Sequence, residues 1–147
     1  MMPNKIILAS KSKIRKQILE KNNIENIVEP SNVDEDLVKI SLLKEKASPE
    51  IISKNLAELK ANKVSMKKND EMVMGADSVI DLGGELISKP ESREEAMSIL
   101  KKLNGKSHFL ISSVCISKNA SMVWNSSDSS NLKMKELNSD QIKSYLN

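Results

Sequence analysis

Polar and charged side chains recur where an apolar stretch ends or a helix is expected to begin, which is where binding and catalytic groups are commonly built. Four such points stand out in the 147 residues: the turn of Ser10, Ser12 and Arg15, then Glu35, then Asp77, and finally Lys89 before Pro90. Together they supply hydroxyls, cations and carboxylates, which are the groups that handle phosphates and divalent metals.

The first of these points resembles a phosphate site. Residues 6–9 form a short apolar run that predicts a buried strand, and the spacing of Ile14, Ile18 and Leu19 predicts a helix that begins near Ser12. The backbone N–H groups at a helix N-terminus are unpaired and the helix dipole is positive there, so a basic turn at this position suits an anion.

The charges are unevenly distributed, although the formal net charge is only +3. Residues 1–22 carry six basic side chains and one acid, whereas residues 23–36 carry five acids and no base. Two interpretations are open: ordinary solvated surface, or a site that holds an anion with one segment and a divalent cation with the next. Charge alone does not decide between them.

Asp77 and Lys60 each have a structural and a functional interpretation. Asp77 follows Gly75-Ala76 between two apolar strand halves, where a buried carboxylate is costly unless it has a partner. The alternative is a turn aspartate that bonds its own backbone. Lys60 lies in an otherwise apolar helical stretch, and the alternative there is a surface lysine whose ammonium reaches water.

Composition excludes several other classes of protein. His108 is the only histidine, which argues against a Ser/His/Asp hydrolase or a histidine zinc site and favours a structural hydrogen bonder. Cys115 is the only cysteine, so it cannot form an internal disulfide, and we expect a core residue. The aromatic content of 2% argues against a base-stacking nucleic-acid platform, and no apolar run is long enough to span a membrane.

The remaining pattern predicts helices that alternate with hairpins, and therefore an α/β protein with a mixed sheet. Capping signals at Ser48 and Ser92 predict two helices, and Gly83-Gly84 predicts a hairpin. Further helices are expected near 37–43 and 138–146. Strands are expected at 24–28, 72–80 with a turn at 75–78, 86–87, 109–116, 122–124 and 132–134.

Six segments, taken together, resemble the successive motifs of the Maf family, the septum-formation-like nucleoside triphosphate pyrophosphatases. They are residues 8–15, 33–35, 56–61, 75–79, 84–90 and 103–108. The resemblance implies an α/β fold similar to the ITPases, with a mixed sheet flanked by helices and two small lobes around a cleft. It also implies a house-cleaning enzyme that hydrolyses a nucleoside triphosphate, ordinary or modified, to the monophosphate and pyrophosphate. The composition itself indicates a cytoplasmic protein.

The resemblance also assigns roles to individual residues. Asp77 matches the general base, and Glu35 matches the acidic residue associated with a divalent cation, Mg²⁺ or Mn²⁺. The substrate-binding positions are Ser10, Ser12, Arg15, Lys60, Ser78 and Lys89. The partner expected is a nucleoside triphosphate, with no nucleic acid or membrane, and the family also suggests a homodimer.

Two departures from the family pattern matter. The pyrimidine-triphosphate group has Ser-Pro-Arg-Arg where this chain has Ser12-Lys13-Ile14-Arg15, and it has Thr in place of Ser78, so base preference stays open. Family members also continue past the position of Leu146. We therefore expect residues 1–147 to be a single domain, truncated at its C-terminus, marginally stable and weakly active or inactive.

Two other functions stay open at this stage. One is a non-catalytic, truncated relative that binds or regulates, or a fragment of a longer gene. The other is a small basic nucleic-acid binder that uses residues 11–21, which the acidic stretch after it and the scarcity of aromatics disfavour.

Overall fold

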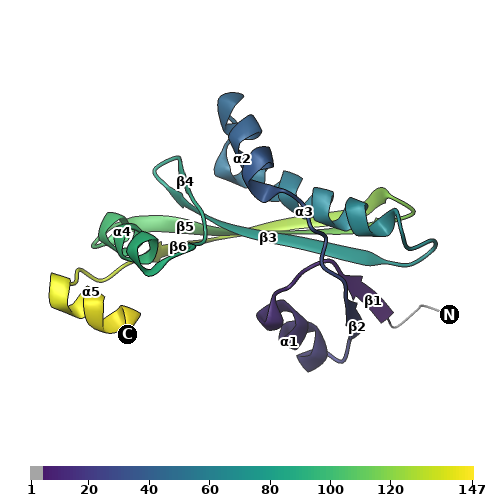
Figure 1. Ribbon diagram of the computed structural model, residues 1–147, viewed down its shortest axis with the longest axis horizontal. Helices are drawn as coiled ribbons and strands as arrows, with labels where there is room; N and C mark the ends of the chain where they lie inside the picture. Colours follow the sequence, from purple (N-terminus) through teal and green to yellow (C-terminus); the bar gives the residue numbers. More distant parts are fainter. Residues whose placement is uncertain (1–4) are drawn as a thin grey trace.

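The computed structural model describes residues 5–147, which form a mixed sheet with helices around it (Figure 1). The strands are β1 (Lys5–Leu8), β2 (Glu25–Val28), β3 (Val73–Leu82), β4 (Glu85–Ile87), β5 (Ser107–Lys118) and β6 (Ser121–Lys133). The helices are α1 (Lys13–Lys21), α2 (Glu35–Lys44), α3 (Pro49–Ser65), α4 (Arg93–Leu103) and α5 (Ser139–Leu146).

The sheet combines a parallel and an antiparallel half. Its strand order is β2-β1-β3-β5-β6, with β4 paired to β3. β1 runs parallel to β2 and β3, whereas β3, β4, β5 and β6 pair antiparallel. In Figure 1, α2 and α3 lie on one side of β3, and α1 lies with β1 and β2 on the other. The expectation of an α/β fold with a mixed sheet is therefore confirmed, and the sheet is open.

The core is densest where α3 crosses β3 and β5. Ile52, Leu56 and Ala61 of α3 are completely buried, and Cys115 of β5 packs against Ala61. Gly75 permits this approach, because a Cβ at that position would lie 2.2 Å from the backbone oxygen of Ala57. Cys115 is thus the core residue that the sequence predicts, and burial raises the pKa of its thiol, which keeps it protonated.

Serine side chains begin the helices at the expected places. Ser12, Ser48 and Ser92 each accept a hydrogen bond from the backbone N–H three residues on, which satisfies one of the donors left unpaired at a helix N-terminus. The positions of α1, α3 and α4 therefore follow from local sequence.

The predicted turn at residues 75–78 is wrong. β3 continues from Val73 to Leu82, and its ladder with β5 is unbroken from Val73 opposite Ser117 to Asp81 opposite Phe109. β6 is likewise one strand rather than two, because the polar residues 125–131 also pair with β5. In both segments a long neighbouring strand, β5, pairs along the whole length, and this outweighs the local turn signals.

One edge of β3 is left open in its middle, and this determines where the cavity lies. β1 pairs only as far as Leu8 opposite Met74, and β4 begins only at Ile80 opposite Ile87. The carbonyl of Met74 still accepts a hydrogen bond from the backbone N–H of Ala9 at 2.8 Å. Beyond that bond, and as far as β4, no strand among residues 5–147 covers this edge.

Candidate active site

A cavity of about 910 Å³ lies beside this open stretch of β3. Its wall includes every residue that the sequence singles out for substrate, metal or catalysis, drawn from the loop before α1, the helices α2 and α3, strand β3 and the segment after β4. Those residues are Ser10, Ser12, Arg15, Glu35, Lys60, Asp77, Ser78 and Lys89. Segments that are far apart in the sequence thus converge on one space.

The turn before α1 is held together by its own hydroxyls. Ser10 Oγ accepts hydrogen bonds from the backbone N–H of Ser12 and from Arg15 Nη1, both at 3.1 Å. Ser12 Oγ accepts the backbone N–H of Arg15 at 3.2 Å. The turn is therefore an ordered loop that presents a guanidinium and the N-terminus of α1 to the cavity.

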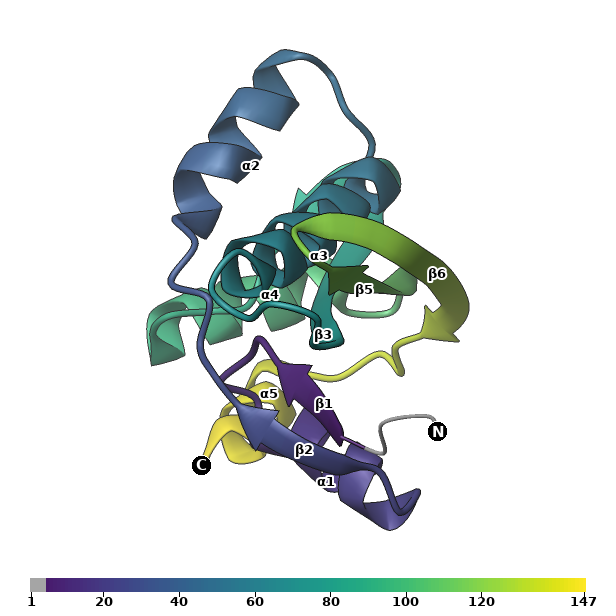
Figure 2. The ribbon, with the colours of Figure 1, turned by 90° about the vertical axis from the view of Figure 1, so that its right-hand side faces the viewer.

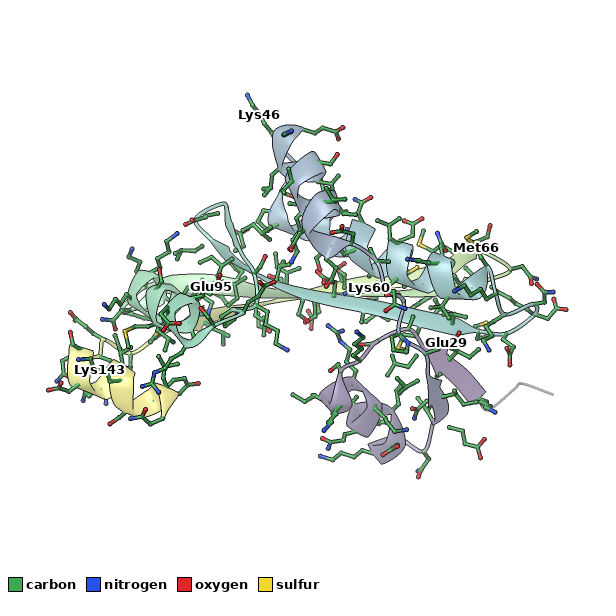
Figure 3. All side chains as sticks on the ribbon, viewed as in Figure 1. Glu29, Lys46, Lys60, Met66, Glu95 and Lys143 are labelled. Atoms are coloured by element: carbon green, nitrogen blue, oxygen red, sulfur yellow. The ribbon has the colours of Figure 1, made fainter. Side chains whose placement is uncertain are left out.

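Lys60 joins α3 to β3 and α2. Its ammonium lies 2.6 Å from Glu35 Oε1 and 3.3 Å from Asp77 Oδ1, and it donates to the backbone oxygen of Ala76 at 3.2 Å. The Ala76 carbonyl is the next one after Met74 on the open edge of β3, so Lys60 satisfies a backbone group that would otherwise pair with a strand. Figure 3 shows Lys60 where α3 lies over β3.

This environment overturns the alternative interpretation of Lys60 as a surface lysine. Its side chain is only 12% exposed. A buried ammonium is stable only with partners, and here two carboxylates and a carbonyl supply them.

Asp77 is a buried carboxylate with one oxygen unused. Its side chain is 8% exposed, and Oδ2 has no hydrogen-bond partner among residues 5–147. Burial raises the pKa of Asp77 above its ordinary value, and the charge of Glu35 adds to that increase. The ammonium groups of Lys60 and Lys39 act in the opposite direction without cancelling it. Because Asp77 lies within a strand, the alternative of a turn aspartate is wrong.

Ser78 and Lys89 complete the predicted set in the cavity wall. Ser78 Oγ lies 3.1 Å from Ser112 Oγ across the β3–β5 pair, and Lys89 follows the last residue of β4 by two positions. Sequence reasoning missed Lys11, Lys13 and Lys39, which also line the cavity. For Lys39 a signal exists, since it lies four residues after Glu35 on α2 and therefore on the same helix face.

The residues present fit a metal that is shared with a phosphate and do not fit a protein cage. No cluster of three or more His, Cys, Asp or Glu side chains suited to a metal occurs within residues 5–147. The cavity does contain two carboxylates, Glu35 and Asp77. Mg²⁺ is commonly held by one or two carboxylates together with substrate phosphates, so this donor set is sufficient for that mode of binding.

His108 lies outside the cavity wall. Its Nδ1 is buried without a hydrogen-bond partner in the described part of the chain, so the expectation that it is a structural hydrogen bonder is wrong for this nitrogen. The same part of the chain contains no helix long and apolar enough to cross a bilayer.

Comparison with known sequences identifies the family. Residues 5–147 match the family described as Maf-like protein. The chain belongs to this family. A nucleoside triphosphate pyrophosphatase of Pelagibacter ubique is 64% identical to this Maf-like chain over 145 residues, which are 99% of the chain and 74% of that relative.

Two more distant relatives carry names that specify a base. A dTTP/UTP pyrophosphatase of Aquifex aeolicus is 35% identical over 97% of this chain and 70% of its own length. A 7-methyl-GTP pyrophosphatase of Brucella abortus is 34% identical over 99% of this chain and 73% of its own length. The Maf-like chain is therefore almost equally similar to relatives named for a pyrimidine and for a modified purine.

Solved structures agree on the fold. A HAM1 protein from Coxiella burnetii superimposes with a TM-score of 0.58 at 13% identity, over 88% of this chain and 72% of that one. The fold is thus similar to that of HAM1 proteins, as the ITPase-like resemblance predicts.

Proposed function

We propose that this Maf-like protein hydrolyses a nucleoside triphosphate to the monophosphate and pyrophosphate. Water gives up a proton to the general base and its oxygen bonds to the α-phosphorus. The bond from the α-phosphorus to the oxygen that bridges it to the β-phosphorus breaks, and pyrophosphate leaves with that oxygen and the bonding electron pair. One observation carries the proposal: a single cavity gathers many cations around a buried carboxylate with a free oxygen. The cations are Lys11, Lys13, Arg15, Lys39, Lys60 and Lys89, against only Glu35 and Asp77 as acids.

The charge of this cavity suits a polyphosphate better than a neutral or cationic ligand. Cations on the phosphate oxygens neutralise the charge that develops as the phosphoryl group is transferred, and this is the largest contribution that a protein makes to such chemistry. Arg15 contributes a planar guanidinium, which bonds two phosphate oxygens at once. Lys89 contributes a point charge and Ser10, Ser12 and Ser78 contribute hydroxyls around it, while the ammonium of Lys60 is held by Glu35 and Asp77.

Asp77 acts as the general base in this proposal. Its Oδ2 is free to accept the proton of the attacking water, while Oδ1 is held by Lys60 at 3.3 Å. A carboxylate whose pKa is raised is a stronger base, and a base positioned in this way contributes about 10²- to 10⁴-fold to the rate. Lys60 orients Asp77 and moderates the increase in its pKa.

Glu35 would hold the divalent cation, Mg²⁺ or Mn²⁺, together with phosphate oxygens of the substrate. When bound, such a cation neutralises phosphate charge and polarises the phosphorus–oxygen bonds. Glu35 is suited to this role because its side chain is 42% exposed on the cavity side of α2, whereas Asp77 is buried.

Which nucleobase the substrate carries stays open. The cavity has an apolar end formed by Ile80, Ile87, Ile99 and Leu110, which suits the face of a nucleobase without choosing among bases. The named relatives point both to pyrimidines and to 7-methylguanine, as described above. Cytoplasmic location, a single domain and a homodimer are further parts of this proposal, and light scattering of the purified chain tests the last of these.

A nucleotide panel tests the proposed reaction. The chain is incubated with dTTP, UTP, 7-methyl-GTP and the common triphosphates in the presence of Mg²⁺ or Mn²⁺, and pyrophosphate is measured together with the monophosphate. We expect equimolar release of the two products from at least one triphosphate. Binding of nucleotide without release would instead favour the non-catalytic alternative, and release of orthophosphate would contradict the proposed position of cleavage.

A further inference from the structure

Helix α2 carries a cation that has no individual role in the proposed reaction so far. Lys39 lines the cavity and is half-buried, yet it takes part in none of the ion pairs found among residues 5–147. The other lysine on this wall of the cavity, Lys60, is fully engaged with Glu35, Asp77 and a backbone carbonyl. Lys39 is thus the free positive charge on the α2–α3 side.

The position of Lys39 is set by contacts near the N-terminus of α2. Glu35 is bound to Lys60 at 2.6 Å, and Lys63 Nζ donates to the backbone oxygen of Asn32 at 2.6 Å. These two contacts anchor the first turn of α2 and the loop before it to α3. Lys39 follows Glu35 by one helical turn on the same face, so the anchor directs Lys39 into the cavity as well.

Packing does not explain why Lys39 lies there. No residue of α2 is buried, and Leu37, Ile40 and Leu43 are about half exposed or more. Figures 1 and 2 show α2 projecting away from the sheet, connected to β2 at one end and to α3 at the other. The helix is therefore held mainly by polar contacts at its start, and the one feature that it adds to the cavity besides Glu35 is the Lys39 ammonium.

We propose that Lys39 is a substrate-binding residue that contacts the polyphosphate from the α2–α3 side, facing the Arg15 turn across the cavity. This inference rests on the proposed function and extends it. The other cations of the cavity lie in the loop and first turn of α1 (Lys11, Lys13 and Arg15) and after β4 (Lys89), and on the α2–α3 side Lys60 is already paired with two carboxylates. Lys39 supplies the missing charge on the side where Asp77 lies. The charge of Lys39 lowers the pKa of Asp77, which agrees with that placement.

The proposal predicts that the affinity lost without Lys39 grows with the number of phosphates. On this proposal a single phosphate occupies only part of the cavity and does not need Lys39, whereas a chain of three phosphates extends as far as Lys39. Inorganic tripolyphosphate and orthophosphate are therefore the right probes, since neither depends on which base the cavity accepts. A charge-assisted contact of this kind is worth about tenfold or more in affinity.

The experiment compares Lys39→Met with Lys44→Met by calorimetric titration. Lys44 is the last residue of the same helix, is exposed, and does not line the cavity, so it controls for loss of one charge from α2. We expect Lys39→Met to bind tripolyphosphate about tenfold more weakly than wild type, with orthophosphate binding unchanged. Lys44→Met should match wild type, and Lys39→Arg should retain most of the tripolyphosphate affinity.

The possible failures are distinguishable. If wild type binds tripolyphosphate well and Lys39→Met binds it equally well, Lys39 is not a ligand and the proposed function is unaffected. If wild type binds neither probe but releases pyrophosphate from a nucleoside triphosphate, the inference about Lys39 is wrong and the proposed function stands; if it does neither, both are wrong. Circular dichroism of Lys39→Met should match wild type, since no buried side chain of α2 is altered; a loss of helix together with equal losses for both probes would make Lys39 a structural residue and overturn the inference.

Discussion

The ammonium of Lys60 lies 3.3 Å from Oδ1 of Asp77, and the second oxygen of that carboxylate has no partner among residues 5–147. The two oxygens of one side chain therefore have different tasks: one anchors the group and the other is available for chemistry. Because the same ammonium also binds Glu35 at 2.6 Å, Lys60 couples the proposed base to the proposed metal ligand. A change at any of the three residues is expected to affect the other two.

Replacing Asp77 with asparagine should abolish pyrophosphate release. Asparagine keeps the shape of the side chain but cannot accept the proton of water, so a loss of at least about 10²-fold in turnover is expected. Nucleotide affinity, measured by titration, should change little. Asp128→Asn is the matched control, since Asp128 is exposed on β6 and does not line the cavity. An Asp77→Asn variant that keeps most of its turnover would show that another group activates water.

The same substitution should raise thermal stability at neutral pH. Burial raises the pKa of Asp77 in the folded protein above the value in the unfolded chain, so the folded state binds the proton more tightly. Ionised Asp77 therefore lowers the stability at pH 7, and this cost disappears as the pH falls through the raised pKa. We expect a higher melting temperature for Asp77→Asn than for wild type at pH 7, with the difference shrinking toward pH 4.

Turnover should also depend on the ionisation of Asp77, but protonation of this carboxylate should lower turnover where it raises stability. The proposed base works only when ionised, so kcat should fall as the pH decreases through the raised pKa of Asp77. The acidic limb of the pH profile should thus lie above the ordinary value for an aspartate, near 3.8. Activity that stays constant down to pH 4 would contradict a titrating base at this position.

Much of the site could be predicted from the sequence, because its positions follow from local signals. The capping serines Ser12, Ser48 and Ser92 mark the helices that carry or flank it. What the sequence could not show is the partner of each charge. The spacing of Asp77 after Gly75-Ala76 indicated a turn, whereas the long pairing with β5 makes it strand. Lys60 looked like a surface residue because nothing local indicates that Glu35 and Asp77 surround it.

Replacing Arg15 with alanine should weaken triphosphate binding more than monophosphate binding. The guanidinium is held by Ser10 Oγ at 3.1 Å and presents its remaining donors to the cavity, where extra phosphates add extra charge. A loss of about tenfold or more for the triphosphate is expected, measured by titration calorimetry. Arg93→Ala on α4, which is exposed and outside the cavity wall, should leave both affinities unchanged. Equal losses for both ligands would make Arg15 structural.

Metal dependence offers a test of Glu35 that does not involve the proposed general base, Asp77. Chelation should abolish pyrophosphate release, and Mg²⁺ or Mn²⁺ should restore it. Glu35→Gln should raise the metal concentration needed for half-maximal activity, because it removes a charged ligand while keeping the side-chain shape. Asp36→Asn, next to it on α2 and exposed, is the control and should need no more metal than wild type. An unchanged metal requirement in Glu35→Gln would remove Glu35 from the proposed metal site.

Gly75 links the stability of the core to the geometry of the site. A Cβ there would meet the backbone oxygen of Ala57 at 2.2 Å and the backbone nitrogen of Ala61 at 2.7 Å, and neither backbone atom can move without shifting α3. Gly75→Ala should therefore destabilise the protein by about 1–3 kcal/mol. Because α3 also carries Lys60, the displacement should reduce turnover as well.

Gly83→Asn is the control: nothing lies within 4 Å of that position, and asparagine tolerates its φ of +58°. Chemical denaturation and pyrophosphate release, measured on both variants, check the two effects. A Gly75→Ala protein as stable as wild type would mean that α3 and β3 are not packed as tightly as this contact requires.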